Sequence, residues 1–160
     1  VTSDVIAHGA NCRGVMGAGI AKQFKKRYPF MYGQYVSDCA TGKYIPGDVM
    51  PFAERDSVTN NDVVGVNLFT QDNPGADATA LAVQVSLILV SQKLKRSFAH
   101  IPVTLAMPLI GCGIGGLTFP EFFSKVYAVA QLFPEIEYKI VYNDSNEDLI
   151  PESVLHATWA

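Results

Sequence analysis

The same local device occurs twice in this chain: a short apolar run, a glycine-rich stretch and a helical pattern. In the first copy, the apolar residues 5–7 precede a glycine loop at residues 8–19 and a helical pattern at residues 20–28. In the second, the run 104–110 precedes glycine loop 111–116 and a helical pattern at residues 119–133. Buried strands followed by helices predict a parallel sheet, whose carboxyl ends lie along one edge. We therefore expect both glycine loops to border one cleft.

The remaining elements fit the same architecture. Helical spacing occurs at residues 31–39 and 78–96, and strand-like runs occur at 48–53, 63–70 and 138–142. The polar residues 54–62 predict a hairpin, and Pro108 limits the strand before it to about Met107, because proline has no N–H for a neighbouring strand. The sequence predicts a three-layer α/β/α sandwich with a mixed, largely parallel central sheet, as a single domain of residues 1–160. Because the first strand begins close to Val1, we expect that an N-terminal strand is missing.

Composition limits the partners. The chain has 160 residues, a net charge of −3 and 49% hydrophobic residues, which excludes whole-chain disorder and argues against duplex nucleic acid as the main partner. The apolar stretch 78–90 is too short to span a membrane, which takes roughly 20 residues, and no signal peptide is visible. Cys12, Cys39 and Cys112 are odd in number and widely spaced, so we expect neither disulfides nor a metal site. The sequence predicts a cytoplasmic monomer without cofactors.

Glycine loops of this kind suit an anionic ligand. Glycine adopts positive φ and lets backbone N–H groups approach phosphate, and the helix N-terminus that follows favours negative charge. Two such loops suit a diphosphate, although glycines also occur in plain tight turns. Gly14 and Gly19 have the spacing of a P-loop, but Ile20 follows where that motif needs lysine. The GxGxxG at residues 111–116 lies too close to the last strand for a dinucleotide-binding fingerprint.

The two loops resemble those of a known family. Residues 4–21, DVIAHGANCRGVMGAGIA, are similar to the ribose-binding first loop of macrodomains, and residues 108–117, PLIGCGIGGL, resemble their diphosphate loop. Residues 69–71 and 140–142 also fall where macrodomains have strand ends. The nearest subgroup contains the ADP-ribose 1''-phosphate phosphatases and the branch that removes ADP-ribose from carboxylates or nucleobases. The resemblance implies that the chain binds ADP-ribose, or a derivative of it that is free or attached to a macromolecule.

The resemblance, together with the loop chemistry, also implies a set of ligand-binding residues. These are Asn11, Arg13, Gly14, Val15, Met16, Gly17, Gly19, Ile20, Thr70, Gln71, Gly111, Cys112, Gly113, Ile114, Gly115, Gly116, Leu117 and Asn143.

Two departures from the family bear on the chemistry. Gln71 stands where the branch that cleaves ADP-ribosyl esters and nucleobases carries lysine, and Gly115 stands where part of that branch has aspartate. Glutamine cannot form a Schiff base, so a lysine-dependent mechanism is not expected. The family's adenine-binding aspartate lies upstream of this chain's first residue, and no residue here is assigned to that role.

His8 and Asn11 are the predicted catalytic residues. The phosphatase-like subgroup also has histidine at the position of His8, and histidine titrates near neutrality. His8 is expected either to activate water against the terminal phosphate or to protonate the departing sugar oxygen; alternatively, it is a strand-end histidine bonded to backbone. Three functions remain open: an ADP-ribose 1''-phosphate phosphatase, a non-catalytic ADP-ribose-binding module, and an ADP-ribosyl hydrolase that positions water through substrate phosphates. Residues 22–27 carry a basic cluster that we interpret as a solvated helix face.

Overall fold

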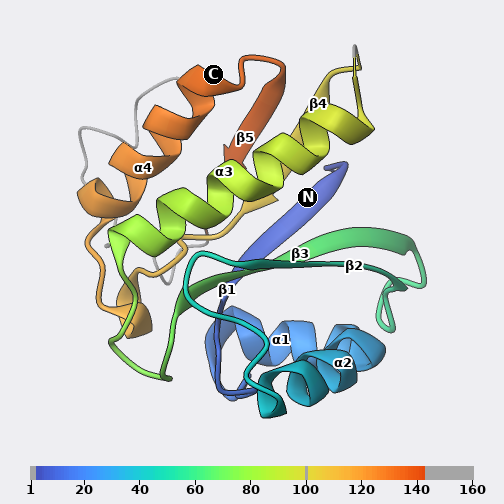
Figure 1. Ribbon diagram of the computed structural model, residues 1–160. Coiled ribbons are helices and arrows are strands. Elements are labelled where there is room, and N and C mark those ends of the chain that lie inside the picture. Colours follow the sequence, from blue (N-terminus) through green and yellow to red (C-terminus); the bar gives the residue numbers. More distant parts are fainter. Residues whose placement is uncertain (1–2, 100, 143–160) are drawn as a thin grey trace.

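Five strands form one mixed sheet in the computed structural model, which describes residues 3–99 and 101–142. The strands are β1 (Val5–Asn11), β2 (Val49–Arg55), β3 (Asp62–Gln71), β4 (Val103–Met107) and β5 (Ile136–Ile140), and they lie in the order β2-β3-β1-β4-β5 (Figure 1). β1 is parallel to β3 and β4, and β4 is parallel to β5. Only the predicted hairpin pair, β2 and β3, is antiparallel.

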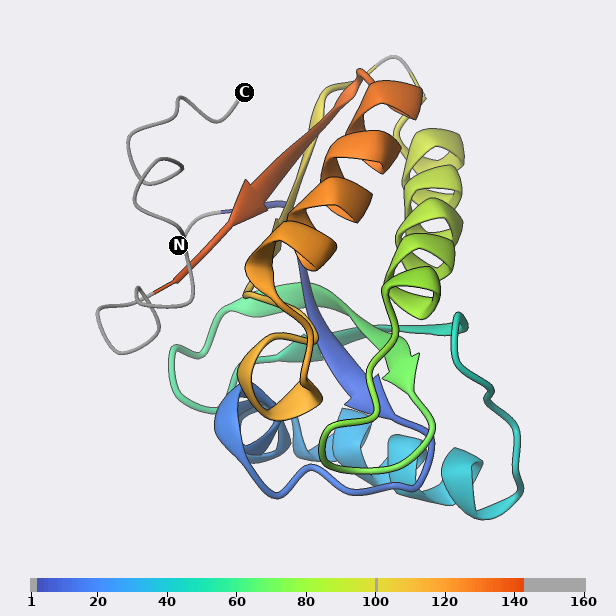
Figure 2. The same cartoon turned by 90° about the vertical axis from the view of Figure 1, so that its left-hand side faces the viewer.

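Helices cover both faces of the sheet. α1 (Gly19–Arg27) and α2 (Pro29–Ala40) pack on one face, over β1, β2 and β3, whereas α3 (Ala80–Ser97) and α4 (Phe119–Leu132) pack on the other (Figures 1 and 2). Each helical layer has its own buried cluster, with Tyr35 and Phe69 in the first and Leu87, Leu105 and Phe122 in the second. The predicted α/β/α sandwich with a largely parallel sheet is therefore confirmed. No helix among the described residues has the length and apolar character needed to cross a bilayer.

β1 is longer than its apolar run predicts. The expected strand ended at Ala7, but β1 pairs with β3 as far as Asn11, opposite Gln71. His8 and Gly9 therefore lie inside the strand, and the first glycine loop is limited to residues 12–18. The strand is extended by its pairing with β3, which is distant in sequence. An apolar run alone does not predict such pairing.

β1 and β4 separate where the strand order reverses. They pair only at Val5 opposite Leu105 and Ile6 opposite Ala106, although β1 continues to Asn11. The connection after β1 runs over the face of α1 and α2, and the connections on either side of β4 run over the other face. Such a topological switch point opens a crevice at the carboxyl ends of the strands. The fold thus creates a gap between the two predicted glycine loops.

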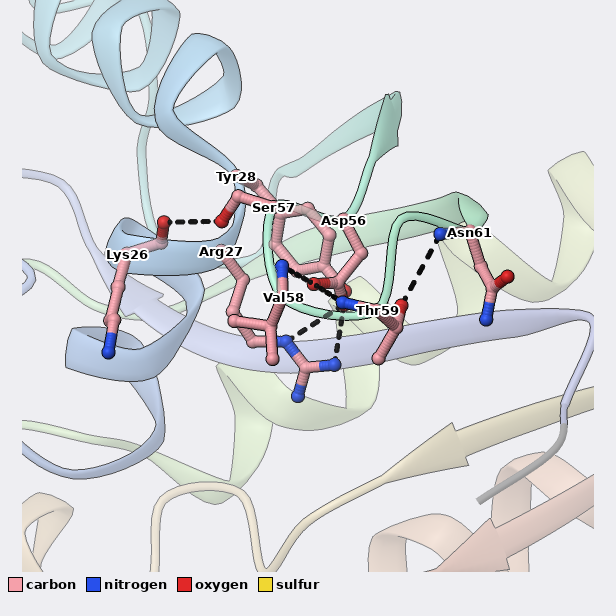
Figure 3. Close-up of polar contacts among 8 residues, drawn as sticks. All are labelled: Lys26, Arg27, Tyr28, Asp56, Ser57, Val58, Thr59 and Asn61. Atoms are coloured by element: carbon pink, nitrogen blue, oxygen red, sulfur yellow. Dashed lines mark hydrogen bonds and ion pairs between the residues drawn. The ribbon is translucent and has the colours of Figure 1, made fainter.

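The turn of the hairpin is held to the end of α1 by one buried carboxylate. Asp56 is 1% exposed and pairs with the guanidinium of Arg27, with Arg27 Nε 2.8 Å from Asp56 Oδ2 (Figure 3). The hydroxyl of Tyr28 donates to Oδ2, and the N–H groups of Val58 and Thr59 donate to Oδ1. Burial alone raises the pKa of Asp56, but these donors together hold it well below its usual value. Arg27, which the basic cluster was expected to expose, is therefore largely a structural residue.

Candidate functional site

The two glycine loops line a single cleft of about 460 Å³ at the carboxyl ends of β1, β3 and β4. Gly17 from the first loop and Gly113 from the second both border it, so the prediction of a shared cleft is confirmed. Figures 1 and 2 show the segments that follow β1, β3 and β4 at the same end of the sheet. The volume lies within the range of small-molecule sites, about 300–1,000 Å³.

Asn11 shapes the first loop at the end of β1. Its side-chain oxygen accepts hydrogen bonds from the N–H groups of Arg13 at 3.0 Å and Val15 at 3.4 Å. The hydroxyl of Tyr35 lies 2.7 Å from the backbone carbonyl oxygen of Asn11 and 3.0 Å from its side-chain oxygen, and Asn11 Nδ2 donates to the Val15 carbonyl at 2.8 Å. An amide nitrogen carries two hydrogens, so one N–H of Asn11 is left over for a ligand, whereas the oxygen is fully used. The loop is consequently built around the residue that was predicted to contact the ligand.

The second loop turns on glycines with positive φ. Gly111 has φ +76° and Gly113 has φ +72°, and the N–H of Leu117 donates to the Gly111 carbonyl at 2.8 Å. The 3₁₀ turn η1, Gly113–Gly115, lies between Gly111 and Leu117. The first three N–H groups of a 3₁₀ turn have no acceptor inside the turn, so those of Gly113, Ile114 and Gly115 are available to an anion.

His8 is a buried, neutral side chain. It is 1% exposed, and its ring stacks on Phe24 at a centroid distance of 3.9 Å. Burial lowers the pKa of His8 to about 4, and the hydrogen bond with Asn67 opposes this only in part. His8 Nε2 lies 2.6 Å from Asn67 Oδ1, so the expectation of a bond to backbone was wrong: the partner is a side chain.

The surroundings of Asn67 define which ring nitrogen of His8 carries the proton. Asn67 Nδ2 lies 3.3 Å from the sulfur of Met31 and 3.4 Å from that of Met50, which leaves Oδ1 as the acceptor facing His8. Nε2 therefore carries the hydrogen. Nδ1 is the unprotonated nitrogen, and it is buried without a hydrogen-bond partner among the described residues.

Most of the predicted site residues border the cleft. Those that do so are His8, Asn11, Val15, Gly17, Gly19, Ile20, Thr70, Gln71, Gly111, Cys112, Gly113, Ile114 and Gly115. Five others do not line it, namely Arg13, Gly14, Met16, Gly116 and Leu117, and Asn143 lies outside the described residues. Met16 is only 1% exposed and belongs to the core beside α2. Burial raises the pKa of the Cys112 thiol to about 11, which leaves it a poor nucleophile.

Sequence reasoning missed two groups of lining residues. The first group lies beside the predicted residues of the two loops: Gly9 and Ala10 in β1, Ala18 and Ala21 at the start of α1, and Pro108, Leu109 and Ile110 after β4. The other is Pro74 and Gly75, in the segment between β3 and α3. A glycine inside a strand was the available signal for Gly9: a Cβ there would lie 3.0 Å from Thr70 Oγ1. The second group had no comparable signal, because Asp72-Asn73-Pro74-Gly75 is typical of any turn.

Comparison with known proteins shows the family. The model of the Macro domain matches residues 7–123, and the chain belongs to that family. A DNA ADP-ribosyl glycohydrolase of Mycobacterium tuberculosis is 28% identical over 162 residues, which cover 98% of this chain and 44% of that protein. The chain thus spans less than half the length of that relative.

Two further similarities, one in structure and one in sequence, differ in how much of this chain they cover. The structure of the macrodomain of Mycobacterium tuberculosis DarG superposes with a TM-score of 0.71 at 26% identity, covering 86% of this chain and 88% of that one. An ADP-ribose 1''-phosphate phosphatase of Meyerozyma guilliermondii is 51% identical over only 37 residues, or 23% of this chain and 21% of that protein. The structural likeness covers most of this chain, whereas the likeness to the phosphatase is local.

Proposed function

We propose that this chain binds the ADP-ribosyl group in the cleft between its two glycine loops. The observation that carries the proposal is the convergence of Gly17 and Gly113 on that one cleft. The N–H groups of Gly113, Ile114 and Gly115 suit the diphosphate, and the remaining N–H of Asn11 suits a hydroxyl of the distal ribose. Membership of the Macro domain family and similarity to enzymes named for ADP-ribosyl substrates support this assignment.

For the reaction, our first candidate is hydrolysis of ADP-ribose 1''-phosphate. Water would attack the terminal phosphorus as the bond from phosphorus to the sugar oxygen breaks. The proton of the water would pass to His8 Nδ1 and from there to the departing sugar oxygen, so that the imidazole ends neutral. Nδ1 carries a lone pair that no described residue uses, and because it is buried, this role as a base requires the water to reach it from the cleft that His8 borders. With the pKa of His8 lowered to about 4, the ring holds no extra proton near neutrality, so it can protonate the sugar oxygen only after it has taken a proton from the water.

A second candidate is removal of ADP-ribose from a macromolecule. The similarity to a DNA ADP-ribosyl glycohydrolase over 98% of this chain favours it. The Gln71 amide is not a nucleophile, so water would have to be positioned by the phosphates of the substrate itself. The third candidate is binding without turnover, for which Asn11 and the glycine loops suffice.

Titration calorimetry with ADP-ribose and with AMP tests the binding proposal. ADP-ribose should bind at one site per chain and at least tenfold more tightly than AMP, which lacks the second phosphate and the distal ribose. Equal affinities, or no binding of either, would refute it.

Turnover assays then separate the three reactions. Phosphate release from ADP-ribose 1''-phosphate that is lost in His8→Ala selects the phosphatase, and release that survives this change removes His8 from the mechanism. Release of ADP-ribose from modified DNA or protein selects the hydrolase. Binding without either product selects the module.

A further inference from the structure

Residues 72–77, which form most of the segment between β3 and α3, touch both glycine loops, and we call them the strap. At the first loop, the N–H of Cys12 donates to the Asp72 carbonyl at 3.0 Å. Arg13 adds two side-chain contacts, from Nη2 to Asp72 Oδ2 at 2.9 Å and from Nε to Asn73 Oδ1 at 3.1 Å. The strap is therefore attached to the first loop by three hydrogen bonds.

The other end of the strap meets the second loop. The N–H of Ala78, the residue after the strap, donates to the Gly115 carbonyl at 3.1 Å. A Cβ on Gly116 would lie 3.2 Å from the Cβ of Ala76, so the two segments are in close contact there as well. Figure 2 shows the green strap beside the orange segment after β4 and the blue segment after β1. The two loops are thus linked to one another through a third segment.

Gln71 fixes the shape of the strap from the end of β3. Its side-chain Nε2 donates to the carbonyl of Asn73 at 2.6 Å and to the carbonyl of Gly75 at 2.8 Å, which uses both of its hydrogens. Asp77 closes the same turn by accepting from the N–H of Asn73 at 2.9 Å. The other end of the Gln71 amide faces the second loop: Oε1 would lie 3.4 Å from a Cβ on Gly115. Gln71 therefore organises backbone on one side and contacts the cleft on the other.

We propose that Gln71 is a positioning residue, and that the strap it holds sets the separation of the two glycine loops before a ligand arrives. The loops belong to different strands, which diverge at this end of the sheet, so the sheet alone does not fix their separation. A cleft whose width is already set binds more tightly, because less ordering is required on binding. The ligand in this inference is the ADP-ribosyl group, so that part rests on the proposed function; the linkage of the loops does not.

Hydrogen exchange and calorimetry on Gln71→Met test the proposal. Methionine has a similar length but no donor, and it adds no charge to the cleft. The amides of Cys12 and Ala78, one at each end of the strap, should both exchange about tenfold faster, since two hydrogen bonds are lost. The Kd for ADP-ribose should rise by a similar factor. Gln34→Met is the matched control, because Gln34 donates to Asp38 on α2, away from the cleft, and should change neither readout.

Arg13→Met tests the same strap without altering a residue that lines the cleft. Its ion pair with Asp72 is exposed, so we expect a smaller acceleration, about twofold to fivefold, again at both amides. Unchanged exchange in Gln71→Met, or acceleration at Ala78 alone, would overturn the proposal. If ADP-ribose does not bind the parent chain, the proposed function fails, and the exchange rates still decide whether the strap links the loops.

Discussion

Lowering the pH tests whether the imidazole of His8, which borders the cleft, is held neutral by burial. The ring is enclosed between Phe24 and the amide of Asn67, and an added proton would have to reside on Nδ1. Burial disfavours that charged form, which is why the pKa of His8 falls from 6.5 to about 4. The perturbation therefore needs no mutation: lowering the pH is sufficient.

The sign and size follow from proton binding in the two states. In the unfolded chain His8 has its ordinary pKa of 6.5, so between pH 6.5 and about 4 the unfolded state binds a proton that the folded state does not. The free energy of unfolding must fall as the pH falls through this window. At about 1.4 kcal/mol per pH unit, the complete loss is about 3 kcal/mol. Above pH 6.5 this stabilisation is fully present, and below pH 4 it is gone.

Urea denaturation of the parent and of His8→Gln at several pH values between 7 and 4 measures this loss. Glutamine keeps a donor for Asn67 but does not titrate, so the difference between the two proteins removes the contributions of all other groups. That difference should change by about 3 kcal/mol across the window. NMR of the imidazole gives an independent value of the pKa. The same pH dependence in both proteins, or a ring that titrates near 6.5, would refute the argument that burial holds His8 neutral.

Two other predictions concern the hairpin and the second loop. Asp56→Ala should cost about 3 kcal/mol in urea denaturation at pH 7, because Arg27 loses a buried partner, and the loss should shrink as the pH falls below 3.8, where the unfolded chain binds a proton that the folded Asp56 does not; an equal loss at pH 2 would contradict this. Gly111→Ala should weaken ADP-ribose binding about tenfold by calorimetry, since φ is +76° and the new Cβ would lie 2.6 Å from Leu117 Cδ1. Gly33→Ala, which meets nothing within 4 Å, is its control and should bind as the parent does.

The parts of the molecule that the sequence predicted are those with a strong local signal. Two apolar runs, each followed by glycines and a helix, placed both loops at one edge of a parallel sheet, and the shared cleft follows from that geometry. The hairpin also has a local signal, in the polar residues between two apolar strands. In each case the relevant residues are neighbours in sequence.

The parts that the sequence did not predict depend on contacts between distant segments. The last residues of β1 pair with β3 about sixty positions away, as in Asn11 opposite Gln71. His8 is neutral because it is buried, with its ring stacked on Phe24 from another element. From the sequence, Gln71 was predicted as a ligand contact and as the residue that stands in place of a lysine, and neither prediction concerns the turn beside it. Its two hydrogen bonds to the strap become visible only once the turn of residues 72–77 is folded.

The site is consequently more than two glycine loops on a common edge. Glycine provides the conformations that expose N–H groups, but it also leaves a loop without side chains to fix its position. In this chain the polar side chains beside the loops supply that fixation: Asn11 from inside the first loop, and Gln71 and Arg13 through the strap. Some of the residues predicted as ligand contacts therefore also hold the loops in place. Substituting them should alter affinity by changing the shape of the cleft as well as by removing a contact.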